Sequence, residues 1–412
     1  MKKFFGVNSK IVLKNTFSLA SAELLIKLIT LLWIAFLGRS LSISDYGRYS
    51  YVNAFIALFA LFPDSGAGLI VVREIAQNKK NQNMLLSSLF YINLSLALIS
   101  CVVIVVYGLI KESLSTTLLI SLASLSMFFT ALRSAPIVKY ESHEKMNVVA
   151  ILNILNSLLI ITLPFILFLV THSILGIFMG MAIGGAMSSV LTWVFFRKSY
   201  PFHLTYNAQA IKKLFLAGLP LGLAAVASMI FSRIDSVMLN FMVGLEAVGR
   251  YNSAVPIVFG MIQLLHVPFA MAIYPTLSRV ESQDKKRFRS SLKKALVVTA
   301  IWTFSAAIGI SLFAPVIVPM IFGSAYQSSS NILQMLIFIL PFASLSAVLY
   351  KILIIKKRQK IYLAISVFGA IANILLNIIL IPSYGVIGAA GASVLTQIGL
   401  FVIYAAVVSK SI

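Results

Sequence analysis

The sequence has little charge and almost no cysteine. Only 11% of its 412 residues are Asp, Glu, Lys or Arg, and there are 11 acidic against 33 basic side chains. The single cysteine, Cys101, excludes an intrachain disulfide bond. Such a small charged fraction, together with 60% hydrophobic residues and a mean hydropathy of +1.00, excludes a water-soluble domain. The composition indicates an integral membrane protein.

Twelve apolar runs are long enough to cross a bilayer as helices. They are continuous and lack the two-residue alternation of membrane strands, so we expect an all-α polytopic membrane protein. The predicted spans are residues 11–37, 45–72, 84–110, 114–138, 148–170, 174–196, 214–243, 247–273, 292–313, 332–355, 361–381 and 386–408.

The sequence also lacks features that many membrane enzymes and pumps have. No GxxxxGK[ST] loop is present to bind ATP, and roughly 25 residues is the longest stretch between spans, too short for a soluble catalytic domain. The outer loops are short and nearly free of charge, which disfavours an enzyme. We therefore expect no catalytic activity and no cofactor, with transport driven by a gradient, and the coupling ion, H⁺ or Na⁺, stays open.

The basic residues gather on one side of the predicted membrane. With an inside N-terminus, 27 of the 33 Lys and Arg residues fall in cytoplasmic segments, which satisfies the positive-inside rule and places both termini in the cytoplasm. The outer side receives Arg39, Arg48, Lys111 and Arg250. Contact of the inner basic loops with anionic lipid explains the net charge of +22 better than a nucleic-acid partner does.

A short motif is repeated at about half the length of the chain. YGRYS at 46–50 returns as VGRYN at 248–252, an offset of 202. Both copies start the second span of a set of six, and six spans return the chain to the same side. The repeat therefore predicts two parallel lobes, residues 1–200 and 201–412, with a pseudo-twofold axis along the membrane normal, as in transporters that rock around a central site.

Ionisable residues inside the spans are the candidates for that site, because a charge in hydrocarbon is costly unless it is paired or hydrated. Glu23 and Lys27 share a helix face at i, i+4, so Glu23 can hold Lys27 for an anion, or the two merely neutralise each other. Asp64 lies in the Pro- and Gly-rich stretch FPDSGAG. The 202-residue offset places His266 at the equivalent depth in the second lobe, where it is either functional or simply bonded to backbone.

Two further charges lie in the seventh span. Arg233 and Asp235 are two residues apart, so they point in different directions and cannot pair across a straight helix. Arg233 suits a phosphate because its planar guanidinium binds two oxygens. For Asp235 we expect an ion pair with an outer arginine, Arg39, Arg48 or Arg250, as a gate at the rim.

Several stretches resemble a known family. GRSLSISDYGRYSYVNAF, PDSGAG and VVREIAQ in the first half, and RIDSVMLNFMVGLEAVGRYNSA, YPTLSR and IPSYGVIGAAGAS in the second, are similar to polysaccharide-biosynthesis transporters of the multidrug/oligosaccharidyl-lipid/polysaccharide exporter superfamily. The resemblance covers nearly the whole chain. It implies a V-shaped fold of two six-helix bundles around a cationic cavity.

The O-antigen (Wzx-type) flippases are the branch that the sequence resembles most. The resemblance implies transfer of an undecaprenyl-diphosphate-linked oligosaccharide across the bacterial inner membrane, alongside other polysaccharide-assembly proteins. Alternatives are a cation-coupled drug exporter of the same superfamily or, less well supported, a polysaccharide-biosynthesis enzyme. Carried onto this chain, the substrate-binding candidates are Glu23, Lys27, Asp64, Arg73, Arg233 and His266.

Overall fold

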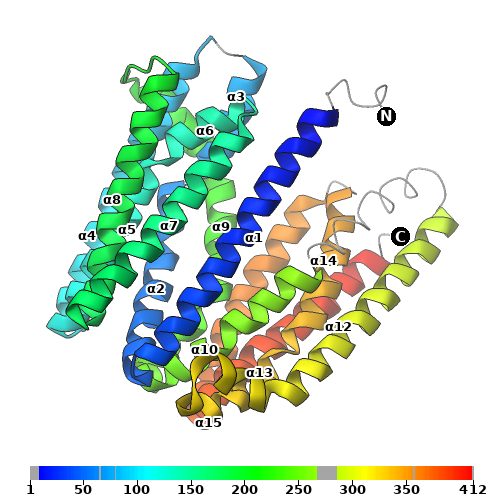
Figure 1. The fold of residues 1–412 in the computed structure, drawn as a ribbon. Helices are drawn as coiled ribbons and strands as arrows, with labels where there is room; N and C mark the ends of the chain where they lie inside the picture. Colours follow the sequence, from blue (N-terminus) through cyan, green and yellow to red (C-terminus); the bar gives the residue numbers. More distant parts are fainter. Residues whose placement is uncertain (1–8, 65, 79, 267–284, 356–357, 411–412) are drawn as a thin grey trace. The chain divides into compact units, whose positions relative to one another are not determined.

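All the regular secondary structure is helical in the part of the chain that the computed structural model describes, which is residues 9–64, 66–78, 80–266, 285–355 and 358–410 (Figure 1). No strand occurs in these ranges, so the all-α prediction is confirmed. The elements are α1 Ser9–Ser40, α2 Ile43–Asp64, α3 Ala67–Gln77, α4 Gln82–Lys111, α5 Leu114–Leu132, α6 Ser134–Ser142, α7 Met146–Thr171, α8 Ile174–Ser199, α9 Ala208–Met242, α10 Leu245–Met261, the π-helix Ile262–His266, α12 Lys285–Phe322, the 3₁₀-helix Ser324–Ser329, α13 Ser330–Leu336, α14 Ile339–Ile355 and α15 Gln359–Ser409.

Eight helical stretches of the described chain are long and apolar enough to cross a membrane. The last of them, Ile361–Ser409, has 49 residues. At 1.5 Å per residue it would be about 70 Å long, more than twice the hydrocarbon thickness of a bilayer. Gly385 breaks it with φ 55° and ψ −129°, at the boundary between the two predicted spans 361–381 and 386–408. This is a multi-pass helical membrane protein.

The predicted weak point in the second span is a real break. α2 ends at Asp64 and α3 begins at Ala67, with Gly66 in the left-handed region at φ 68°. A Cβ atom at Gly66 would lie 2.5 Å from Cβ of Leu221 and 2.9 Å from the carbonyl oxygen of Gly218. The break therefore lets the chain approach the first half of α9 closely.

A second break divides the fourth predicted span, 114–138, which the sequence reading treated as one helix. α5 ends at Leu132 and α6 begins at Ser134, so Arg133 stands at the junction. Its guanidinium is buried: Nε donates to Oγ1 of Thr192 at 3.1 Å and Nη2 donates to the carbonyl oxygen of Leu152 at 2.8 Å. Arg133 thus joins the break to α7 and α8 and is not a cytoplasmic loop residue.

Contacts divide the chain into two compact units. Unit 1 comprises Met1–Trp33 and Phe55–Val226, and unit 2 comprises Ile34–Ala54 and Ala227–Ile412. The helices α1, α2 and α9 therefore contribute residues to both units. The division into lobes at residues 1–200 and 201–412 stays a prediction.

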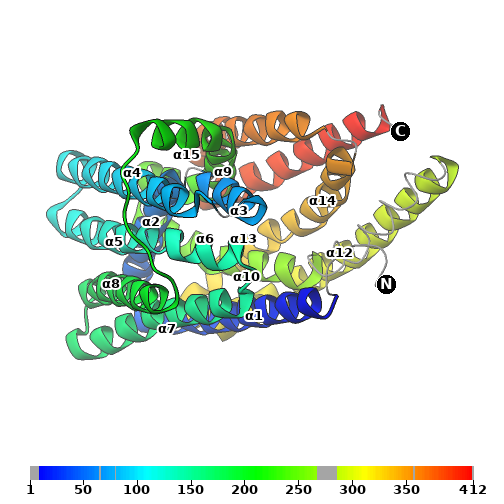
Figure 2. The same ribbon diagram turned by 90° about the horizontal axis from the view of Figure 1, so that it is seen from above.

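Unit 1 is held together by close packing of helices. Its helices α4, α5, α8 and α7 lie side by side in that order (Figure 2). Small residues let backbones approach: a Cβ atom at Gly180 of α8 would lie 2.4 Å from Cα of Pro164 in α7. Lipid tails are as apolar as the helix surfaces, so the hydrophobic effect does not drive helices together in a membrane. Close contacts of this kind and interhelical hydrogen bonds hold them together instead.

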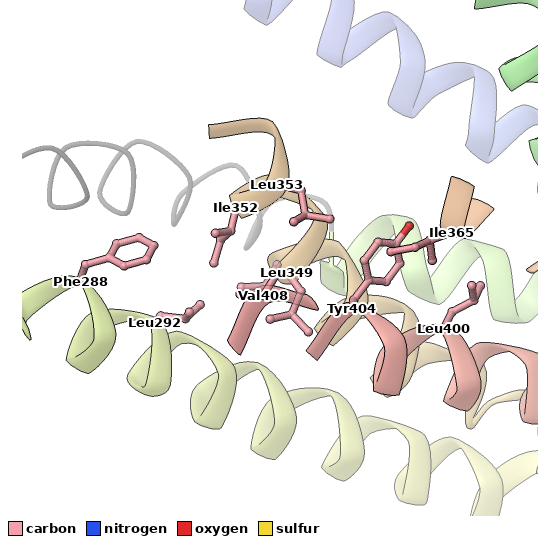
Figure 3. Packing of buried hydrophobic residues seen from close by; sticks show 10 residues of the cluster. Phe288, Leu292, Leu349, Ile352, Leu353, Ile365, Leu400, Tyr404 and Val408 are labelled. Atoms are coloured by element: carbon pink, nitrogen blue, oxygen red, sulfur yellow. The ribbon is translucent and has the colours of Figure 1, made fainter. Parts of the chain in front are cut away.

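Unit 2 has its apolar core where α12, α14 and α15 meet (Figure 3). Phe288 and Leu292 of α12 face Leu349 and Ile352 of α14, and Tyr404 packs from α15. The first turns of α12 carry Lys and Arg around these apolar residues. The core therefore fixes the basic end of α12 against the rest of unit 2.

Candidate functional site

In unit 1 the structure describes two of the four predicted site side chains. Lys27 lies partly buried on α1, and Arg73 is exposed on α3. Glu23 lies in α1 and Asp64 is the last residue of α2, but their side chains fall outside the described part of the structure. The proposed pairing of Glu23 with Lys27 therefore stays a prediction.

In unit 2, Arg233 and Asp235 of the seventh predicted span differ in exposure, as a separation of two residues in a helix predicts. Arg233 is exposed on α9, whereas Asp235, two residues on, is only 5% exposed. His266 ends a π-helical turn that follows α10, and its side chain is outside the described part. π-Helical turns interrupt regular helix bonding and are frequent at functional sites.

Asp235 is the centre of a buried polar cluster. Its Oδ2 accepts hydrogen bonds from the Tyr251 hydroxyl at 2.6 Å and from the Ser393 hydroxyl, and its Oδ1 accepts one from Asn377 Nδ2 at 2.6 Å. The donors come from α10 and from both sides of the Gly385 kink in α15. Three neutral donors thus solvate a carboxylate that has lost its water, as burial requires.

The cluster continues along α15 through a second amide. Asn377 Nδ2 also donates to Oδ1 of Asn373 at 3.1 Å, and both asparagines are fully buried. Oδ1 of Asn377 and Nδ2 of Asn373 are buried without a hydrogen-bond partner. Turning the Asn377 amide over would present its oxygen, in place of its NH₂ group, to Asp235.

The expected ion pair between Asp235 and an outer arginine is absent, because each arginine has another neighbour in unit 2. Arg39 Nε donates to the carbonyl oxygen of Ile321 at 3.0 Å, at the end of α12, and Arg250 pairs with Glu246 at 2.6 Å. Arg48 lies 4.0 Å from Asp45. No described Lys or Arg lies within ion-pair distance of Asp235. The role of these residues as a gate stays a prediction.

The two copies of the sequence repeat touch each other within unit 2. A Cβ atom at Gly47 would lie 1.8 Å from the carbonyl oxygen of Leu245, and one at Gly249 would lie 2.2 Å from that of Ile43. Both members of the contact shift by the repeat offset, since 249 − 47 and 245 − 43 are each 202. Only glycine permits this approach of α2 to α10.

The sequence reading missed the partners of Asp235. Tyr251 lies in the second copy of the repeat, and Asn373, Asn377 and Ser393 lie in the last two predicted spans. One signal was available: two asparagines at i, i+4 in an apolar helix form a polar stripe that must be satisfied inside the protein.

The fold and composition thus define a multi-pass helical membrane protein. A family model described as "Polysaccharide biosynthesis protein" matches residues 12–281. The chain belongs to this family, and the resemblance found in the sequence is confirmed.

Two of the similar proteins match most of the chain, and a third matches less than half of it. A putative O-antigen transporter of Shigella dysenteriae is 24% identical, over 87% of this chain and 90% of that protein. The capsular polysaccharide biosynthesis protein CapF of Staphylococcus aureus is 24% identical, over 92% and 94%. A probable glycan biosynthesis flippase, Agl15 of Haloferax volcanii, is 23% identical over 42% of this chain and 37% of its own length.

Solved structures share the fold at low identity. The lipid II flippase MurJ in an inward closed conformation has a TM-score of 0.79 at 18% identity, covering 94% of this chain and 86% of that one. A multidrug resistance MATE family transporter of the MOP superfamily, in an inward-facing conformation, has a TM-score of 0.71 at 15% identity, covering 93% of this chain and 95% of that one. At these identities the likeness concerns the fold alone.

Proposed function

We propose that this protein is a flippase that carries an undecaprenyl-diphosphate-linked oligosaccharide, an O-antigen or related repeat unit, from the cytoplasmic to the periplasmic leaflet of the bacterial inner membrane. The observation that carries the proposal is the family match, with O-antigen transporter and capsular polysaccharide relatives aligned over most of the chain. The fold shared with a lipid flippase supports it. In this proposal the protein is not an enzyme, both termini are cytoplasmic, and other polysaccharide-assembly proteins act alongside it.

The embedded cations suit the charge of such a substrate. A diphosphate that crosses hydrocarbon needs cationic partners, whereas the isoprenoid tail stays in lipid. Lys27 in unit 1 and Arg233 in unit 2 are the described candidates for the headgroup, with Glu23, Asp64, Arg73 and His266 in supporting roles.

The decisive experiment is a lipid extract from cells that lack the gene, analysed by mass spectrometry for isoprenoid diphosphate carrying a complete oligosaccharide. We expect the finished unit to accumulate on the cytoplasmic face while surface polysaccharide is lost. Complementation with Lys27→Ala or Arg233→Ala should fail although the protein inserts normally, and Lys111→Ala, at an exposed outer position, serves as the control. Intact polysaccharide without accumulation would reject the flippase and favour a drug exporter.

We further propose that the coupling ion, H⁺ or Na⁺, acts at Asp235. Either ion would neutralise a carboxylate that is buried without a described cation nearby. The oxygens of Asp235, Ser393 and Tyr251, with the amide groups of Asn373 and Asn377, are of the hard type that suits Na⁺. The unsatisfied amide atoms of the two asparagines fit such a role. An ionised carboxylate favours the NH₂ end of a neighbouring amide, whereas a protonated carboxyl or a bound cation favours its oxygen.

Asp235→Asn tests this proposal, because it keeps the shape of the side chain and removes the charge. In vesicles that hold the purified protein, imposed H⁺ and Na⁺ gradients should each be tried separately. We expect one of them to drive transport in the native protein, and Asp235→Asn should lose that dependence while still binding substrate. Undiminished coupling in the variant would exclude Asp235 as the site.

A further inference from the structure

The segment between α8 and α9 has an unusual combination of exposed apolar and basic side chains. Residues 200–207, here called the strap, are not helical and connect two membrane-spanning stretches, Ile174–Ser199 and Ala208–Ala227. Figure 2 shows the strap as an extended segment that crosses the view from the end of α8 to the start of α9. The whole strap belongs to unit 1.

The strap is fixed to the helices beneath it. The backbone N–H of Thr205 donates to Oγ of Ser87 at 3.1 Å, and that hydroxyl lies 3.5 Å from the carbonyl oxygen of His203. Ser87 is fully buried at the start of α4. Phe202 packs inward between the rings of Trp193 and Phe196, at 5.7 and 5.4 Å. The backbone of the strap is therefore tied to the helices beneath it.

Two large side chains of the strap are exposed, and the ring of one of them, Tyr206, also packs edge-on against Tyr91 of α4 with the centroids 5.6 Å apart. Leu204 is 48% exposed and Tyr206 is 74% exposed. The strap begins and ends next to spans, so these side chains lie at the level of the bilayer surface. Tyrosine is enriched at this level because its ring is apolar and its hydroxyl is polar. An exposed leucine beside it indicates contact with lipid and not with bulk water.

Four cations flank the strap, and no acid lies among them. Arg197 and Lys198 end α8, Lys212 and Lys213 lie in the first turns of α9, and all four are exposed. The stretch 197–213 contains no Asp or Glu; the nearby acids, Glu141 and Glu144, lie outside it. Each cation near an anionic membrane surface contributes about 1 kcal/mol, so four favour anionic lipid strongly.

We propose that the strap and its four flanking cations bind anionic phospholipid headgroups, with Leu204 and Tyr206 inserted among the lipids. The occupant follows from charge complementarity and from the exposed apolar side chains. Basic residues alone would only set the topology. The pinned backbone and the exposed leucine and tyrosine make this a binding surface, one that ties the connection between α8 and α9 to the membrane.

A fluorescence experiment on the full chain tests the proposal without any transport assay. Leu204→Cys, in a Cys101→Ser background, is labelled with an environment-sensitive dye and reconstituted in mixed phosphatidylcholine and phosphatidylglycerol vesicles. Either lipid is supplied with brominated chains, which quench the dye on contact. We expect brominated phosphatidylglycerol to quench at least about twofold more than brominated phosphatidylcholine at equal content.

The ratio of quenching by brominated phosphatidylglycerol to quenching by brominated phosphatidylcholine should fall to about one when glutamine replaces Arg197, Lys198, Lys212 and Lys213. Because this variant could insert wrongly, a second measurement uses the protein that keeps all four cations. Salt at about 1 M shortens the electrostatic screening length to about 3 Å and should reduce the quenching ratio in the same way. Leu114→Cys is the matched control: Leu114 is 74% exposed beyond the opposite end of α4, and its ratio should be about one throughout.

Equal quenching by the two lipids at position 204, or a preference that persists after neutralisation and in high salt, would overturn the proposal. A dye that neither lipid quenches would also overturn it and would point to an acidic protein partner for the strap.

Discussion

Arg133 in unit 1 and Asp235 in unit 2 are deeply buried charges that differ in sign and in the way they are held; Lys139 of unit 1 is buried as well. Arg133 and Asp235 are both 5% exposed, and no described residue of opposite charge pairs with either. Arg133 donates to a helix carbonyl and a threonine hydroxyl. Asp235 accepts from a tyrosine, an asparagine and a serine.

The difference lies in what can change each charge. A guanidinium keeps its proton at any physiological pH and binds partners with a rigid fork. A carboxylate can be neutralised by a proton or by Na⁺. Unit 1 therefore contains a fixed charge that joins helices, and unit 2 contains the charge that we propose an ion neutralises.

The largest effect is expected from Asp235→Leu. It leaves the Tyr251, Asn377 and Ser393 donors without their acceptor in a buried site, which should lower the free energy of unfolding by on the order of 3 kcal/mol. Unfolding in mixed micelles with increasing SDS measures the loss. Asp235→Asn, which keeps the shape, is the control and should lose much less. Equal losses would show that charge, and not donor satisfaction, dominates the cluster.

Arg133→Met should cost less, about 2 kcal/mol, because Leu152 and Thr192 keep other helix bonds when the guanidinium is removed. Arg133→Lys retains the charge but not the fork and should recover only part of the loss. The same SDS series measures both variants. Neither should change the H⁺ or Na⁺ dependence of transport; a change like that of Asp235→Asn would abolish the distinction between the two units.

The smallest effects come from removing one hydroxyl beside each charge. Tyr251→Phe removes a donor to the carboxylate and should cost about 1.5 kcal/mol, and Thr192→Val removes one acceptor from the guanidinium and should cost about 1 kcal/mol. Titration with the coupling ion should distinguish these two variants more clearly than their free energies of unfolding do. Tyr251→Phe should alter the apparent ion affinity, whereas Thr192→Val should leave it unchanged.

The sequence predicted the features that depend on local pattern. Apolar runs located the helices, and Pro63 with Gly66 predicted the break between α2 and α3. The break at Arg133 was missed because the apolar run continues across it, although Pro136 follows three residues later. The partners of Asp235 could not be predicted, because Asn377 and Ser393 are 142 and 158 residues away in the sequence. Predicted depth in the membrane made the outer arginines equally suitable as partners of this carboxylate.

The contact between Gly47 and Gly249 has a consequence for the way the two copies of the repeat meet. Each glycine meets the residue that corresponds, under the 202-residue shift, to the one met by the other. Reciprocity of this kind defines the isologous interface of a twofold homodimer. The crossing of α2 and α10 therefore has the symmetry of a contact between two copies of one segment, and a side chain added at either glycine would force the same two helices apart.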